Sequence, residues 1–262
     1  MMLDAHPALA IPPETHFIPL LKRVWDESPQ PRDAAIATLV DHQRWSDFDI
    51  DGDRFRERVA GAPATSLGDV LRVFYATYAE RHGKWRWGDK TPRYVLDMPM
   101  IAGVLPEARF IHLIRDGRDV ALSVRPLWFG PTSIEEAAIW WKERVEAGQR
   151  AGSELRYMEV RYESLVGSVR SELERVCDFL DLDFREDMLQ GHTRACARLA
   201  EEKDLPKQGI AAERRREIHA RVRVRPDPSG VGRWRTEMTP DERRRFEELA
   251  GDTLERLGYP TG

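Results

Sequence analysis

The chain has 262 residues, of which 41% are hydrophobic and 33% are charged, and its formal net charge at pH 7 is −4. This composition can supply a substantial apolar core, whereas the negative net charge argues against a protein that coats nucleic acid. It still allows a small anionic ligand, which needs only a local group of cations. No stretch is long and apolar enough to cross a membrane and no secretory signal is visible, so the cytoplasm is the default location.

The first third of the chain is predicted to be mostly helical. Pro12 and Pro13 impose an extended approach, and from Thr15 onward apolar residues recur at helical spacing, with Pro19 tolerable only in a first turn. After a turn over 63–69, a broad apolar stripe indicates another helix. The stripe consists of Leu67, Val70, Leu71, Phe74, Tyr75 and Tyr78.

Strands and helices alternate in the middle of the chain. The segment KWRWGDKTPRYV predicts a short aromatic strand, which is followed by Lys90 and by Thr91 as the N-cap of a turn containing Pro92. Further strands are expected over 110–114 and 155–160, with a helix over SIEEAAIWWKERVEAG between them.

The last part of the chain carries two more helices. An amphipathic helix ending near Leu180 includes Cys177, which we interpret as a small buried hydrophobic residue; with Cys196 as the only other cysteine, no disulfide framework is expected. Residues 191–230 are predicted to be irregular, and their basic run at 214–216 is typical of a solvated helix face. Thr239 and Glu242 form a capping box at the start of a closing helix.

The alternation of strands and helices predicts an α/β fold in which helices cover both faces of a parallel sheet. In such sheets ligands bind beyond the carboxyl ends of the strands. Lys90 and the turn at Asp116 each follow a predicted strand, so we expect them on the same rim of the sheet.

The segment RFIHLIRDGRDVALSV leads from a strand into charged residues and then into an apolar helix. Arg115 can offer a planar fork of donors to an oxyanion, the helix that starts near Gly117 adds free N–H groups, and Ser123 adds a hydroxyl. These groups suit a phosphate. An ion pair between Arg115 and Asp119 explains the same charges without a ligand, and the residues alone leave both interpretations open.

Five segments, in order, resemble those of sulfotransferases that use 3′-phosphoadenylyl sulfate (PAPS), especially tyrosylprotein-type and related bacterial sulfotransferases. They are LDAHPALAIPPETHFIP, GDKTPRYV, IRDGRDVALS, VRYESLV and VGRWR. The resemblance extends from Leu3 to Arg235. It implies a P-loop NTPase-like α/β fold, a single sulfotransferase domain over 1–262, PAPS as co-substrate without a metal, and a small-molecule or peptide acceptor.

The resemblance also implies roles for individual residues. Arg115 and Ser123 correspond to the positions that bind the 3′-phosphate, and Tyr162 corresponds to a tyrosine that contacts the cofactor. Glu14 corresponds to the catalytic base and Lys90 to a lysine that stabilises the transition state near the leaving oxygen. Arg233 and Trp234 fall in the cofactor-binding closing loop.

Structural interpretations compete with each of these roles. Glu14 precedes a predicted helix and would favour its dipole, and Lys90 could simply be exposed. Tyr162 and Trp234 are large enough to be ordinary core residues. His16 is an alternative base.

One departure from the family concerns the N-terminus. Members carry a strand and a Gly-rich phosphate-binding loop ahead of the segment that begins here at Leu3, so we expect a fold truncated at its N-terminus, because of either a late start codon or a true loss.

The function predicted is transfer of a sulfuryl group to a hydroxyl or amine. The alternatives are an inactive protein that binds 3′-phosphoadenosine, or a P-loop kinase relative.

Overall fold

The computed structural model describes residues 1–127, 130–191, 193 and 227–262, which form two compact units. The first unit comprises Met1–Glu107 and Phe184–Arg225, and the second comprises Ala108–Asp183 and Pro226–Gly262. The basic run at 214–216 lies outside the described residues. The assignment of the whole chain to one sulfotransferase domain stays a prediction.

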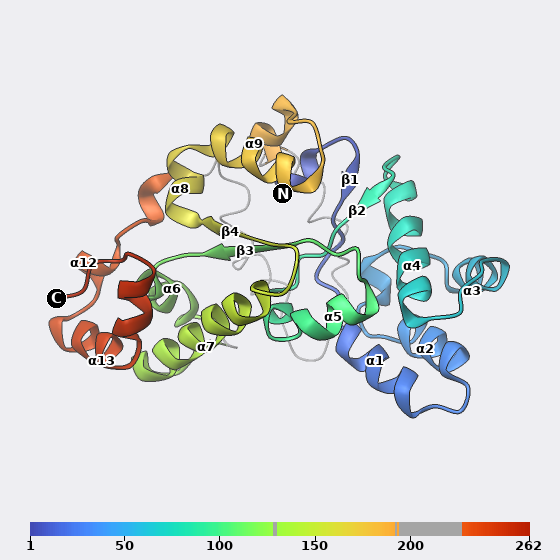
Figure 1. Ribbon diagram of the computed structural model, residues 1–262, viewed down its shortest axis with the longest axis horizontal. Coiled ribbons are helices and arrows are strands. Elements are labelled where there is room, and N and C mark those ends of the chain that lie inside the picture. Colours follow the sequence, from blue (N-terminus) through green and yellow to red (C-terminus); the bar gives the residue numbers. More distant parts are fainter. Residues whose placement is uncertain (128–129, 192, 194–226) are drawn as a thin grey trace. The chain divides into compact units, whose positions relative to one another are not determined.

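The first unit is mainly helical and contains one short pair of parallel strands (Figure 1). Its helices are α1 (Ile18–Glu27), α2 (Pro31–Val40), α3 (Gly52–Gly61), α4 (Leu67–Arg81) and α5 (Met98–Val104). Its 3₁₀ turns are η1 (Leu3–Ala5), η2 (Trp45–Asp47), η3 (Pro92–Leu96) and η4 (Glu186–Gln190). Strand β1 (Leu9–Ala10) pairs in parallel with β2 (Arg86–Trp87).

The core of the first unit is built on the predicted stripe of α4. All six stripe residues are buried, and Ser66 and Asp69 form a capping box at the start of the helix. The ring of Phe74 makes edge contacts with Phe17 and Phe48 at centroid distances of 5.2 and 5.0 Å. These aromatic contacts attach the segment before α1 to the core of the unit, so the backbone of the neighbouring candidate residues is anchored.

One local prediction in the first unit is wrong, and another, Thr91 as the N-cap of the turn that contains Pro92, is confirmed in position. Helix α1 begins at Ile18 rather than Thr15, because His16 lies in the left-handed region with φ 58° and a right-handed helix cannot run through it. Thr91 does occupy the N-cap position of η3, but its hydroxyl makes no capping bond and instead donates to Asp89.

The second unit has a second pair of parallel strands with helices on both sides of it (Figure 1). The strands are β3 (Phe110–Ile114) and β4 (Tyr157–Arg161). The helices and the one 3₁₀ turn are α6 (Gly117–Val124), α7 (Ile134–Gly152), α8 (Tyr162–Gly167), α9 (Val169–Leu180), η6 (Pro228–Gly230), α12 (Trp234–Glu237) and α13 (Pro240–Arg256). Strand β4 starts two residues later than predicted, because Glu154 and Leu155 are still bonded to the end of α7.

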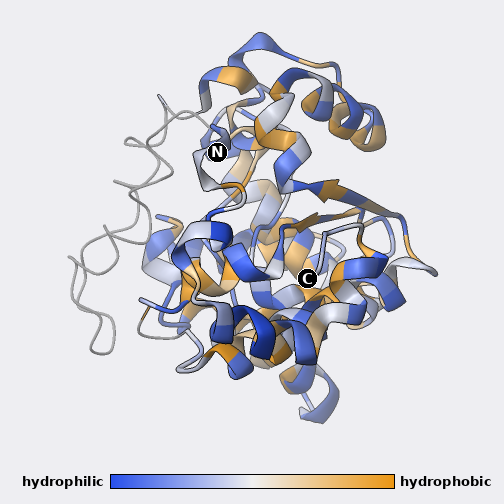
Figure 2. Ribbon diagram, turned by 90° about the vertical axis from the view of Figure 1, so that its left-hand side faces the viewer, coloured by the Kyte–Doolittle hydropathy of each residue, from blue (hydrophilic) through white to orange (hydrophobic). Residues whose placement is uncertain are grey.

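The core of the second unit lies between α6, α7 and α13. Apolar stripes on these helices meet there, which fits the alternation of hydrophobic and hydrophilic residues along the helices in Figure 2. Helix α13 begins with the predicted capping box, in which Thr239 and Glu242 bond each other's backbone N–H. Cys177 of α9 is buried, as expected.

The predicted α/β class is confirmed in its essentials. The strands of the described residues run parallel, and each pair is accompanied by helices of its own unit. A single rim that carries both Lys90 and Asp116 stays a prediction, and so does the truncation of the fold. Among the described residues, none of the helices has the length and apolar character needed to cross a membrane.

Candidate active site

The first group of candidate residues follows the carboxyl ends of β1 and β2. The two strands are parallel and in register, with Gly88 N–H donating to Ala10 O at 2.9 Å, so the segments that leave them run on side by side. These segments bring Glu14 and Lys90 together. Lys90 Nζ donates to Glu14 Oε1, and His16 Nε2 donates to Glu14 Oε2 at 3.0 Å.

The carboxyl group of Glu14 is acidic in this setting. Burial acts to raise its pKa, but the hydrogen bond from His16 and the positive charge of Lys90 outweigh burial and lower the pKa to about 2. Glu14 is therefore ionised at neutral pH. Its side chain is 28% exposed and that of Lys90 is 64% exposed, so both groups reach solvent.

A network of hydroxyl groups around Asp89 fixes the backbone beneath this ion pair. The Asp89 carboxylate accepts hydrogen bonds from Thr15 Oγ1 at 2.6 Å, from Thr91 Oγ1 at 2.7 Å and from the Tyr75 hydroxyl at 2.6 Å. Thr15 N–H also donates to Thr91 Oγ1 at 3.1 Å. Because Thr15 is adjacent to Glu14 and Asp89 is adjacent to Lys90, the network holds the two candidate catalytic residues in position.

Tyr94 extends this network to helix α1. Its hydroxyl lies 2.8 Å from Thr15 Oγ1 and accepts the N–H of Ile18 at 3.1 Å. Burial raises the pKa of Asp89 and of Tyr94 above their usual values. Between these fixed points His16 has its left-handed backbone, a conformation that non-glycine residues adopt mainly where the surrounding structure enforces it.

The second group of candidate residues follows the carboxyl ends of β3 and β4. Ile114 lies opposite Arg161, so the next residues, Arg115 and Tyr162, are neighbours. The guanidinium carbon of Arg115 is 4.7 Å from the centre of the Tyr162 ring, a cation–π contact. Arg115 Nη1 donates to Ser123 Oγ at 3.1 Å, so three of the expected cofactor-binding residues do come together.

Arg115 is enclosed but not fully bonded. Its side chain is 14% exposed, and Nη2 donates to the backbone carbonyl of Gly230. Its buried Nε has no hydrogen-bond partner among the described residues. Asp119 is 3.8 Å from Nη2, which makes the ion pair considered from the sequence a long one. A guanidinium with an unused donor beside a hydroxyl group fits an oxyanion such as phosphate.

Helix α6 presents its N-terminus next to this arginine. Asp116 caps the helix by accepting the N–H of Arg118 at 2.9 Å, and Trp141 Nε1 donates to Arg115 O at 3.0 Å. A Cβ atom at Gly117 would lie 2.5 Å from the Trp141 ring, so only glycine fits this first helical position. The sequence prediction of a helix starting at Gly117 is confirmed.

Arg233 and Trp234 make contacts of a different kind. Arg233 pairs with Glu237 at 2.6 Å along α12. Trp234 is 5% exposed, and the guanidinium of Arg118 lies 3.5 Å from the centre of its ring. The indole of Trp234 is thus part of the packed interior, although its backbone belongs to the segment that bonds Arg115.

Sequence reasoning missed Asp89 and Gly230, and it considered Asp119 only as an ion-pair partner of Arg115. Asp89 stood in the motif GDKTPRYV without a feature that marked it out. Only the fold shows that Asp89 collects hydroxyl groups and that Gly230, far along the chain, meets Arg115.

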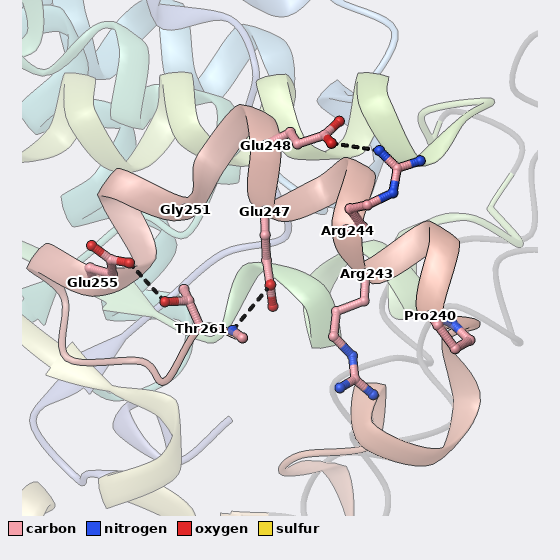
Figure 3. A pocket seen from close by; sticks show the side chains of 9 residues that line it. Pro240, Arg243, Arg244, Glu247, Glu248, Gly251, Glu255 and Thr261 are labelled. Carbon is pink, nitrogen blue, oxygen red and sulfur yellow. Dashed lines mark hydrogen bonds and ion pairs between the residues drawn. The ribbon is translucent and has the colours of Figure 1, made fainter.

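A hollow of about 550 Å³ runs along the outer side of α13 (Figure 3). Polar residues of its lining bond one another: Arg244 pairs with Glu248, and the Thr261 hydroxyl donates to Glu255. None of the candidate site residues lines it. Within the described ranges, no group of His, Cys, Asp and Glu side chains has the arrangement of a metal site.

Comparison with known proteins identifies the family of the chain. Residues 1–186 match the Sulfotransferase family. A candidate protein-tyrosine sulfotransferase of Caenorhabditis briggsae is 26% identical over 211 residues, covering 77% of this chain and 71% of that protein. The nodulation protein NoeE of Sinorhizobium fredii is 28% identical over 222 residues, covering 72% of this chain but only 49% of NoeE.

A solved structure shares the fold over the whole length of the chain. The sulfotransferase domain from the curacin biosynthetic pathway superposes with a TM-score of 0.61 at 16% identity, covering 100% of this chain and 92% of that domain. The protein belongs to the sulfotransferase family. It is an enzyme of the class that transfers sulfuryl groups, which the motif order had predicted.

Proposed function

We propose that the protein transfers a sulfuryl group from PAPS to a hydroxyl or amine group of a small-molecule or peptide acceptor. The observation that carries the proposal is the contact of Arg115 with Ser123 and Tyr162 at the carboxyl ends of β3 and β4. The spare Nε donor of Arg115 supports an anionic ligand at this position.

On the donor side, Arg115 and Ser123 would hold the 3′-phosphate, with Tyr162 beside them. Arg233 and Trp234 would contribute through the segment that Gly230 begins, Arg233 by its charge and Trp234 by anchoring the segment in the interior. PAPS, when bound, supplies an activated sulfuryl group. The chain contributes orientation and positive charge, which are the main requirements for in-line transfer of such a group.

On the acceptor side, Glu14 would take the proton from the attacking hydroxyl or amine, and Lys90 would stabilise negative charge on the departing oxygen. The present pairing of the two residues suggests a link between these tasks. Glu14 is ionised and able to accept a proton, but its low pKa makes it a weak base while Lys90 stays bonded to it. If Lys90 turns toward a leaving oxygen, Glu14 becomes more basic.

Binding of adenosine 3′,5′-bisphosphate tests the donor site without knowledge of the acceptor. Arg115→Ala should weaken binding about tenfold or more, because a hydrogen bond to a charged group contributes roughly 1.5–3 kcal/mol. Calorimetry on the wild type should also show a clear preference for the bisphosphate over adenosine 5′-monophosphate.

Arg125→Ala is a suitable control, since it removes the same charge from an exposed ion pair with Glu242 in the same unit. Its bisphosphate affinity should be nearly normal. Equal affinity of the wild type for the two nucleotides would refute the assignment of the 3′-phosphate to Arg115 and Ser123.

A further inference from the structure

The carboxylate of Asp119 is enclosed in the second unit, yet its closest partners are backbone amides. The side chain is 0% exposed. Its Oδ2 accepts the N–H of Gly232 at 2.7 Å and its Oδ1 accepts the N–H of Trp234 at 3.0 Å. The distance to Arg115 is longer, at 3.8 Å. Each oxygen therefore holds one amide of the segment 230–234, which is distant in sequence.

The same segment lies against Arg115 through Gly230. The Gly230 carbonyl accepts a hydrogen bond from Arg115, and a Cβ atom at this glycine would lie 3.0 Å from the Tyr162 hydroxyl and 3.4 Å from Arg115 Nη2. Gly232 has φ +73°, a conformation that side chains disfavour. The backbone conformation of the segment is thus restricted at both glycines. Asp119 adds a further restraint through its hydrogen bonds to the Gly232 and Trp234 amides.

We infer that Asp119 is a positioning residue of the donor site, which fixes segment 230–234 beside Arg115 so that the phosphate of a nucleotide meets both together. This inference rests on the proposed function and adds a residue to it. Asp119 is not itself a ligand of the phosphate, since a carboxylate repels an anion. It acts through the two amides and the segment they belong to.

Electrostatics and positioning predict opposite results when the charge of Asp119 is removed. A carboxylate 3.8 Å from Arg115 reduces the attraction of that arginine for anions, so its removal alone would tighten phosphate binding. If Asp119 instead holds the segment in place, its removal frees the segment and weakens phosphate binding. The sign of the change in affinity distinguishes the two roles.

The test is Asp119→Asn, which keeps the size of the side chain but loses an acceptor. Calorimetry with adenosine 3′,5′-bisphosphate and with adenosine 5′-monophosphate should show about tenfold weaker binding of the bisphosphate and little change for the monophosphate. Asp178→Asn, which removes an exposed carboxylate of α9 in the same unit, is the charge-matched control and should leave both affinities unchanged. Bisphosphate binding by Asp119→Asn that is equal or tighter would overturn the inference.

A measurement on the wild type keeps the inference testable if Asp119→Asn does not fold. The bisphosphate should slow amide hydrogen exchange in peptides covering 228–238 more than the monophosphate does, and equal protection by the two would overturn the inference. A wild type without preference for the bisphosphate would refute the proposed function and this inference with it. A preference that Asp119→Asn retains in full would refute the inference alone.

Discussion

The two groups of candidate residues differ in how they hold charge. In the first unit the ion pair of Glu14 with Lys90 reaches solvent, and only the backbone beneath it is fixed, by the hydroxyl groups around Asp89. In the second unit the cation itself is enclosed, because Arg115 lies against Tyr162 and bonds Ser123 and the Gly230 carbonyl.

This difference fits the two chemical tasks that we propose for these groups. A proton acceptor and a cation that stabilises a leaving group must change their hydrogen-bond partners during a reaction. Exposed side chains on a fixed backbone can do so. A site that recognises a phosphate gains from cations that are already oriented, since less conformational entropy is then lost on binding. We therefore expect mutations in the first group to alter turnover and mutations in the second group to alter binding or folding.

The largest effect is expected for Glu14→Gln, which keeps the shape of the side chain but cannot accept a proton. Turnover should fall by about 10²–10⁴, the usual contribution of acid–base catalysis, with bisphosphate affinity nearly unchanged. The measurement compares kcat and calorimetric binding in both proteins, once an acceptor has been identified. Near-normal turnover would transfer the role of base to His16 or to the substrate.

A large loss of stability is expected for Arg118→Ala in the second unit. Arg118 is fully buried and pairs with Asp116 at 2.8 Å and with Glu247 at 2.6 Å, so its removal leaves two carboxylates without their cation. Such a change costs about 3–5 kcal/mol, which denaturant unfolding would measure. A loss below about 1 kcal/mol would show that the buried charges of the second unit stabilise the fold less than the comparison implies.

The smallest effect is expected for Lys90→Met, and it depends on pH. Without the positive charge, the pKa of Glu14 should rise from about 2 toward its ordinary value of 4.5, which a titration of the Glu14 carboxyl group by NMR would follow. A lowered folded-state pKa contributes stability above pH 4.5, and this contribution is lost as the pH falls toward 2. The variant should therefore lose less stability than the wild type over that interval.

An unchanged pKa of Glu14 in Lys90→Met would mean that His16 alone holds the carboxylate ionised. In that case the ion pair of Glu14 with Lys90 would have little influence on the pKa of Glu14, and the proposed link between Lys90 and the basicity of Glu14 would fail.

Much of the fold followed from local patterns in the sequence. The apolar stripe of α4, the helix over 169–180 and the capping box of α13 were all identified correctly, because hydrophobic periodicity and capping residues act over short distances. The boundary of α1 was wrong for a reason that periodicity does not contain. The left-handed conformation of His16 is set by the bonds of Thr15 to Asp89 and Thr91, which lie in a different segment.

The site was predictable to a similar extent. Motif order identified Arg115, Ser123 and Tyr162, and their contact follows from two parallel strands that end at the same level. The bonds of Asp119 to the Gly232 amide and of Arg115 to the Gly230 carbonyl were not predictable, because they depend on how a segment near the C-terminus returns to α6. The catalytic roles of Glu14 and Lys90, and the cofactor contacts of Arg233 and Trp234, stay predictions.

The glycine at position 117 has a consequence for protein engineering. A side chain there would collide with Trp141 and Phe246, and Trp141 also bonds the carbonyl of Arg115. The turn at residues 115–117 therefore packs directly against α7 and α13. A mutant library aimed at a new donor nucleotide should therefore vary positions 117, 141 and 246 jointly or leave all three untouched. Libraries that randomise the turn alone would consist largely of misfolded variants.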